Sequence, residues 1–147
     1  MSFAEIVLRL GVAFVSWIII YLNFIALLVV KIAECPGGDV APWTMSFATG
    51  LLTIGAALTL PYGHALKGAA AVRFIAVPLL VLLPFALWVI LPYLAGTTID
   101  AQVVCDVSKA MSSGNEAAGW QRAWAPLQLA AVIAVAVNGW RIWRQPA

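Results

Sequence analysis

The stretch LGVAFVSWIIIYLNFIALLVV, residues 10–30, decides the fold class of this chain. It carries no charged side chain, and its polar members are Ser16, Tyr21 and Asn23. A helix needs about 20 mostly apolar residues to cross the roughly 30 Å of bilayer hydrocarbon, whereas the core of a signal peptide has only about 7–15. The stretch is therefore predicted to be a retained transmembrane helix.

The composition of the whole chain indicates the same class. Of its 147 residues, 64% are hydrophobic and 10% are charged, and the mean hydropathy is +1.01. Soluble domains are about 45–50% apolar and about 25% charged. A chain of this length cannot bury so much apolar surface in its own core, so the lipid bilayer is an expected partner. The net charge of +2 comes without a run of Lys or Arg, which argues against nucleic acid as a partner.

Three further apolar stretches follow at residues 43–60, 74–94 and 127–143. Together with the first stretch they predict a single domain, an all-α integral membrane four-helix bundle. The third stretch contains three prolines and is predicted to kink, most of all at Pro84. Pro126 marks either the start of the fourth helix or a kink in it, and Asn115 is placed to cap a short helix before it.

The distribution of charge predicts how the bundle sits in the membrane. Four spans place both termini on one side and the loops 31–42 and 96–125 on the other. The side of the termini would carry five basic residues and one acid, and the loop side three basic residues and five acids. The positive-inside rule therefore predicts cytoplasmic termini (N-in/C-in) in the plasma membrane, which in a bacterium is the inner membrane. The two loops would form a structured region outside the cell membrane.

The two cysteines of the chain, Cys35 and Cys105, fall in the two predicted outer loops. Thiols that lie close together in an oxidising compartment form disulfides. A bridge that closes a loop of this length contributes roughly 4–5 kcal/mol in the chain-entropy model, less any strain. A structural disulfide is therefore the expected role. A redox pair and a metal site are the alternatives, but there is no C-x-x-C pair and no histidine on that side.

Small and polar residues form one face on each of two predicted helices. These faces consist of Ser46, Thr49, Gly50 and Thr53 on the second helix and of Ala130, Ala134 and Asn138 on the fourth. Such residues let helices approach closely in lipid, where hydrophobicity gives no net attraction between them. Packing within the bundle is the expected role, and docking against another protein is the alternative. Polar residues inside the spans, such as Asn23 and Gln128, suit interhelical hydrogen bonds worth about 0.6–2 kcal/mol.

No motif for catalysis or nucleotide binding occurs in the sequence, so we expect no enzyme activity, no cofactor and no metal. No Asp, Glu, Lys or Arg lies within the core of a predicted span, although intramembrane charge is the usual mark of an ion path or proton relay. The only histidine, His64, follows the second span. An interfacial polar residue is its expected role, and a single axial ligand for a haem or pigment is the alternative.

Three functions are compatible with these features. The first is a non-catalytic accessory subunit or assembly partner of a larger membrane complex, with Trp120 and Trp124 of the outer region available for contact with other membrane protein subunits. The second is a free-standing binding protein of the cell envelope, such as an immunity protein, which acts through its disulfide-tied outer loops. The third, a small transporter or channel, is disfavoured because charge is missing from the spans.

Overall fold

The computed structural model describes residues 3–32, 40–59 and 70–144, most of which are helical. The elements are α1 (Phe3–Ile32), α2 (Val40–Thr59), α3 (Ala70–Tyr93), the π-helix η2 (Leu94–Ile99), α4 (Val104–Lys109) and α5 (Gly119–Arg144). These residues contain no β-strand, and their one β pairing is an isolated bridge between Gln102 and Glu116. The predicted all-α fold is confirmed.

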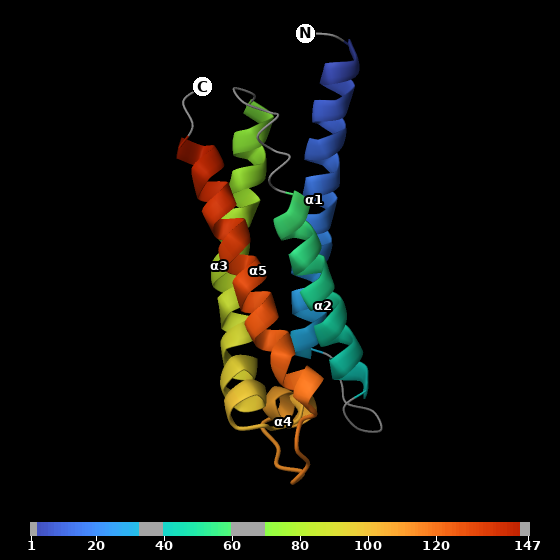
Figure 1. Cartoon of the computed structure of the whole chain (residues 1–147), viewed down its shortest axis with the longest axis vertical. Coiled ribbons are helices and arrows are strands. Elements are labelled where there is room, and N and C mark those ends of the chain that lie inside the picture. The colour runs from blue at the N-terminus through green and yellow to red at the C-terminus, as the bar shows by residue number, and fades with distance from the viewer. Residues whose placement is uncertain (1–2, 33–39, 60–69, 145–147) are drawn as a thin grey trace.

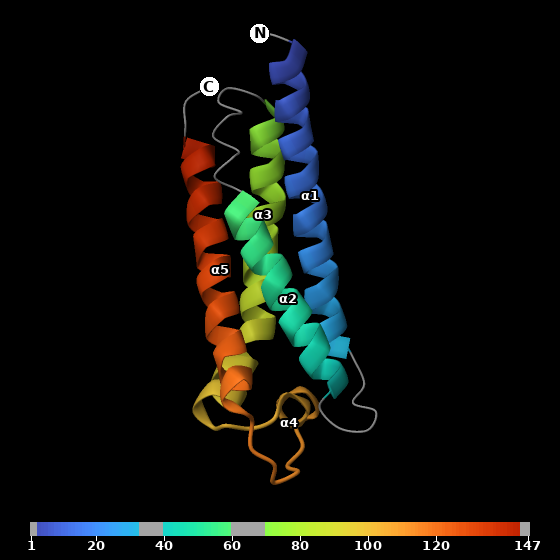
Figure 2. The same cartoon turned by 45° about the vertical axis from the view of Figure 1, so that its right-hand side comes forward.

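Four long helices, α1, α2, α3 and α5, run side by side, each antiparallel to the one before it (Figure 1, Figure 2). They contact one another in a ring, α1 with α2, α2 with α5, α5 with α3 and α3 with α1. α1 begins and α5 ends at one end of the bundle, while η2 and α4 close the opposite end. Their 30, 20, 24 and 26 residues correspond to helices of about 30 Å or more, at about 1.5 Å per residue.

Length and hydropathy together identify one stretch that can cross a membrane among the described residues. This stretch is Val81–Ile99, which has a mean hydropathy of 1.7 and includes the end of α3 and all of η2. A second apolar segment, Ile18–Val30 in α1, is shorter. These segments agree with association with a membrane, and the four-span arrangement and its orientation stay predictions.

The interior of the bundle is filled by apolar side chains from all four long helices. Leu27 of α1, Ile90 of α3 and Val132 of α5 are among the buried residues. Aromatic pairs also join neighbouring helices. In one of them, the ring centroids of Phe24 on α1 and Phe85 on α3 lie 5.0 Å apart. Such pairs contribute about 0.5–1.5 kcal/mol beyond the area that they bury.

The outer surface of the long helices is apolar as well. Large exposed hydrophobic residues include Phe14, Leu22 and Leu28 on α1, Phe47 and Leu51 on α2, Trp88 and Leu91 on α3, and Ile133 and Val137 on α5. The charged side chains that the structure describes are Asp100, Asp106, Lys109, Glu116 and Arg122 near α4, and Arg141 and Arg144 at the end of α5. Soluble monomers rarely expose contiguous apolar patches larger than a few hundred Å².

The fourth long helix starts earlier than predicted, at Gly119 rather than at residue 127. The side chain of Gln121 reaches back, and its Oε1 accepts a hydrogen bond from the Ala118 N–H at 2.6 Å. This contact is one half of a capping box, which satisfies a backbone donor at the start of a helix. Asn115, the expected cap, lies outside the helix. A polar first turn therefore extends the helix beyond its apolar stretch.

The third helix runs without interruption through its prolines, and its geometry changes only after Pro92. From Leu94 the chain winds as the π-helix η2, in which the Asp100 N–H donates to the Ala95 carbonyl, five residues earlier, at 3.1 Å. Pro78, Pro84 and Pro92 all lack an N–H for the α-helical ladder, and the α-helix continues through all three. The hydrogen-bond pattern changes at the end of the helix rather than at Pro84.

Candidate functional site

The cap, residues 94–118, closes one end of the bundle with η2, α4 and the segment that leads into α5 (Figure 2). A buried carboxylate organises its outer loop. Oδ2 of Asp106 accepts hydrogen bonds from the backbone N–H of Ser113 at 3.0 Å and from the Ser113 hydroxyl at 2.7 Å. The Met111 N–H donates to the Asp106 carbonyl at 2.9 Å. These bonds give the loop a defined shape outside the four-helix core.

Close packing joins η2 to α4. A Cβ on Gly96 would overlap Cγ2 of Val107 and would lie 3.2 Å from its Cγ1, so only glycine fits at this contact. A hydrogen bond between the side chains of Ser108 on α4 and Tyr93 at the end of α3 adds a polar contact. The cap is therefore held against the end of α3 by both apolar and polar contacts.

Reciprocal hydrogen bonds join the cap to α5. Pro126 lies inside α5 and has no N–H, so the carbonyl of Arg122, four residues earlier, lacks its usual helical donor. The Thr98 hydroxyl of η2 donates to this carbonyl at 2.8 Å. In return, Nε and Nη2 of Arg122 donate to the Thr98 carbonyl at 3.3 and 3.1 Å. A neighbouring helix thus satisfies the backbone group that proline leaves free.

Replacing Thr98 by Val should lower the free energy of unfolding by about 1 kcal/mol, because the Arg122 carbonyl then loses its donor. Thr98→Ser keeps the hydroxyl and should stay near wild type. Pro126→Ala restores an N–H to α5, so Thr98→Val should cost less in that background. Unfolding by a denaturing detergent, followed by circular dichroism, measures each variant. Equal losses with and without Pro126 would contradict this account.

The two tryptophans that we predicted to contact a partner, Trp120 and Trp124, differ in their exposure. Trp120 is 62% exposed, and its ring lies 4.4 Å from that of Trp43 between centroids. Trp124 is only 4% exposed, because α5 turns it inward, edge-on to Tyr93 with the ring centroids 5.5 Å apart. The expectation that Trp124 is available to a partner is therefore wrong. The large apolar side chains exposed on and beside the cap are Ile99, Met111 and Trp120.

A groove of 260 Å³ runs between α2 and α5, next to the cap. Its walls include Trp43, Phe47, Leu51 and Ile54 of α2 and Trp120 and Leu127 of α5, and we refer to this feature as the α2–α5 groove. Gly50 and Ala123 also line it, and no charged residue does. The groove is therefore an apolar recess in a surface whose other exposed side chains are also largely apolar.

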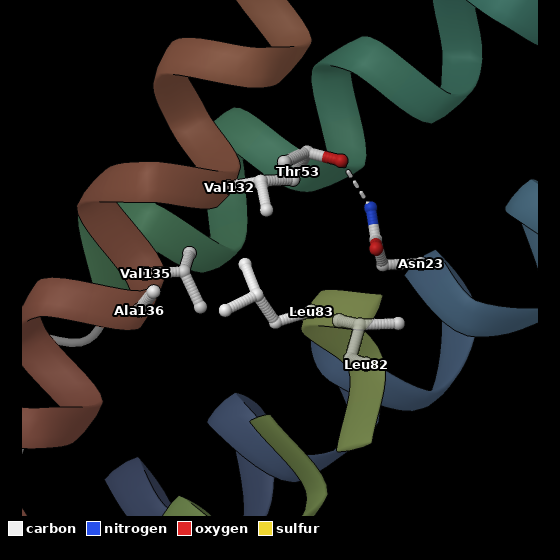
Figure 3. Close-up of a pocket in the computed structure, with 7 residues that line it drawn as sticks. All are labelled: Asn23, Thr53, Leu82, Leu83, Val132, Val135 and Ala136. Carbon is white, nitrogen blue, oxygen red and sulfur yellow. Dashed lines mark hydrogen bonds between the residues drawn. The ribbon is translucent and has the colours of Figure 1, made fainter. Parts of the chain in front are cut away.

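The small face predicted on α2 lies inside the bundle, because Ser46, Thr49, Gly50 and Thr53 are all buried. The amide of Asn23 on α1 donates to the Thr53 hydroxyl and, at 3.4 Å, to the Thr49 carbonyl (Figure 3). The Thr53 hydroxyl donates in turn to the Thr49 carbonyl at 2.9 Å. The interhelical hydrogen bond that we predicted for Asn23 is confirmed.

A small cavity adjoins this network (Figure 3). Asn23 and Thr53 line it together with apolar residues such as Leu83 and Val135, and its volume is about 10 Å³. A space of this size holds about one water molecule at most. The carbonyl oxygen of Asn23 has no hydrogen-bond partner among the described residues. The cavity is too small to receive a larger ligand.

Gly50 allows α2 and α5 to approach closely. A Cβ on Gly50 would lie 3.2 Å from both Cδ1 and Nε1 of Trp124, and 4.0 Å from Oε1 of Gln128. Within the described part of the chain, the Trp124 indole N–H and the Gln128 amide have no hydrogen-bond partner. The interhelical hydrogen bond predicted for Gln128 is therefore not found there. The sequence around Trp124 and Gln128 contains no pattern that predicts their contact with Gly50.

The small face predicted on α5 does not pack between helices. Ala130 and Ala134 are exposed, whereas Gln128, Val132 and Val135 are buried. A helix turns once in 3.6 residues, so positions 128, 132 and 135 share one face and the two alanines lie away from it. The bulkier residues fill the interior, which corrects the prediction for Ala130 and Ala134. The side chain of Asn138 lies outside the described residues.

Cys35 of the predicted disulfide and the only histidine, His64, both lie outside the described residues. Cys105 is buried in α4 and is not a free thiol. Its predicted bridge to Cys35 stays a prediction. Among the residues that the structure describes, no group of three or more His, Cys, Asp or Glu could hold a metal ion.

Comparison with protein-family models, with curated proteins and with solved structures finds no match for this chain.

Proposed function

We propose that this chain is a small, non-catalytic, multi-pass membrane protein that serves as an accessory subunit or assembly partner of a larger membrane complex. The distribution of side chains carries this proposal. All four long helices expose large apolar residues, while the described charged residues lie at the two ends of the bundle. Exposure of apolar surface to water costs about 25 cal/mol per Å², and lipid removes this cost. In this proposal, each long helix crosses the membrane.

The proposed orientation places both termini in the cytoplasm and the cap outside the plasma membrane. It follows from the excess of basic residues on the side of the termini in the sequence. Of the described basic residues, Arg141 and Arg144 lie at the end of α5 and Lys109 and Arg122 lie near α4, so the orientation rests on the count over the whole sequence. In an oxidising compartment outside the membrane, Cys105 would pair with Cys35 and tie the cap to the loop before α2.

The cap is the proposed contact surface for the partner. Its exposed apolar residues Ile99 and Met111 project from a part of the chain whose shape is held by the buried Asp106 and the Thr98–Arg122 bonds. Protein interfaces are typically anchored by a few large side chains on a preformed surface. Met111 lies beyond the apolar stretch Val81–Ile99 and would have no lipid to cover it, which favours coverage by protein.

Purification from membranes in a mild detergent should yield this chain together with a partner in fixed stoichiometry. The double variant Ile99→Ala/Met111→Ala should lower the recovered partner by about tenfold, if the two side chains together contribute about 1.4 kcal/mol. The matched control is Ile133→Ala/Val137→Ala, which truncates two exposed apolar residues of α5 away from the cap. Equal recovery from both double variants would place the contact elsewhere.

A free-standing envelope binding protein, such as an immunity protein, is the second candidate, because the same exposed cap would face a soluble ligand. In that case the chain should be purified as a lone monomer, and no stoichiometric partner should appear in mild detergent. A small transporter or channel is the least favoured function, since no charged residue occurs within the core of a predicted span.

A further inference from the structure

The α2–α5 groove has the dimensions of one leaflet of a membrane. Trp43 lies in the first turn of α2, at the end of the bundle that the cap closes, and Ile54 lies deeper along the same helix. The distance between them along the helix is about 16 Å, at 1.5 Å per residue. One leaflet contributes about half of the roughly 30 Å of bilayer hydrocarbon. In the proposed membrane embedding, the groove would run from the membrane interface to about the middle of the bilayer and would not cross it.

Two indole N–H donors in the groove have no acceptor in the described part of the chain, that of Trp43 at the interfacial end and that of Trp124 deeper, beside Gly50. Trp43 is 5% exposed and Trp124 is 4% exposed, and the indole N–H of neither finds a partner among the described residues. Both rings line the groove, and the exposed ring of Trp120 lies over Trp43. A buried N–H without an acceptor is unfavourable, so a ligand that brings an acceptor to this end gains from it.

We propose that the groove binds one acyl chain of a membrane phospholipid, whose ester carbonyl accepts a hydrogen bond from the Trp43 indole. The proposal rests on the membrane embedding proposed above. The chain would lie against Phe47, Leu51 and Leu127, whose exposed side chains form the open walls. Trp120 would move aside at the interface to let the carbonyl reach Trp43. No charged residue lines the groove, so binding does not depend on the headgroup.

A phospholipid chain fits these observations better than a helix of another protein. A transmembrane helix needs about 30 Å of contact to cross the bilayer beside this one, whereas the groove ends near Ile54. The unpaired indole N–H of Trp43 lies at the interfacial end, which is the depth of the ester groups of a phospholipid. A helix has already paired its own carbonyls inside the membrane and offers few acceptors at that depth.

The test uses the full chain in mild detergent and counts bound lipid by native mass spectrometry. Ala123 is exposed and lines the groove, so Ala123→Leu should fill the groove and displace the lipid. Ala130 is exposed on the same helix but does not line the groove, so Ala130→Leu is the matched control. Wild type and Ala130→Leu should retain one phospholipid for each chain, and Ala123→Leu should lose it.

Dioleoylphosphatidylcholine and its diether analogue test the carbonyl directly, because the analogue has a CH2 group in place of each ester carbonyl. The ester lipid should bind about three- to tenfold more tightly, which is the range expected for one hydrogen bond. Trp43→Phe removes the donor and should abolish this difference between the two lipids. Equal affinities for the two lipids in the wild-type protein would overturn the proposal, as would full retention of lipid by Ala123→Leu.

The failure of this proposal can be distinguished from the failure of membrane embedding. Cell fractionation that recovers the chain in the soluble fraction overturns both proposals. Recovery in the membrane fraction, together with lipid binding that Ala123→Leu leaves unchanged, overturns the groove proposal alone.

Discussion

The intact protein should show no thiol to a maleimide reagent that cannot cross membranes, and after reduction both Cys35 and Cys105 should react from outside. Cys105 is buried and not free, and the sequence contains only one other cysteine. Closing a loop of this length contributes roughly 4–5 kcal/mol in the chain-entropy model, less any strain. Reduction should therefore lower the free energy of unfolding by a large part of this amount, as measured by unfolding with and without reductant.

Single variants test whether the two cysteines act as a pair. Cys35→Ser and Cys105→Ser each remove the same bridge and should lower the free energy of unfolding by similar amounts. The double variant should cost no more than either single variant, because groups that act together are not additive. Labelling of either thiol from the cytoplasmic side would contradict the proposed orientation, and additive losses in the double variant would contradict the bridge.

Gly50→Leu should lower the free energy of unfolding by about 3 kcal/mol, the upper part of the usual range for overpacking. The added Cβ alone would lie 3.2 Å from Cδ1 and Nε1 of Trp124, which is closer than an ordinary van der Waals contact. Trp124 has little freedom to yield, because it is buried and packs against Tyr93. Denaturing-detergent titration followed by circular dichroism measures the loss.

Gly55 provides a matched control on the same helix. A Cβ at Gly55 meets nothing within 4 Å, so Gly55→Leu should leave the free energy of unfolding near that of wild type. Both substitutions make the same chemical change in the same helix, and they therefore share any effect of helix propensity. A similar loss in the two variants would show that the contact between Gly50 and Trp124 is not what limits stability.

Much of the fold follows from local patterns in the sequence. The charge-free stretch at residues 10–30 predicts a helix that the structure extends to Phe3–Ile32, and the stretch at 43–60 corresponds to α2 at Val40–Thr59. These elements are predictable because composition over about 20 residues decides whether a segment forms an apolar helix. The hydrogen bond of Asn23 was also foreseeable, since a polar amide inside an apolar helix needs a partner.

The ends and faces of the helices were less predictable, since they depend on single contacts. α5 starts at Gly119 because Gln121 caps the Ala118 N–H, a contact that no apolar pattern reveals. It continues through Pro126 because Thr98, distant in the sequence, donates to the carbonyl that proline leaves free. Pro126 and the turn residues before it therefore predicted a later start for α5 than the structure shows.

By itself, the sequence determined that this chain forms long apolar helices with charge only at their ends, since hydrophobic burial depends on composition and not on the position of any one partner. Tertiary structure alone decided which side of each helix faces inward. It buried Trp124 and exposed Ala130, although the sequence pattern predicted contact with a partner for the first and helix packing for the second. When all faces of a helix are apolar, hydropathy cannot separate the interior from the surface, and close contacts such as that of Gly50 with Trp124 make the choice.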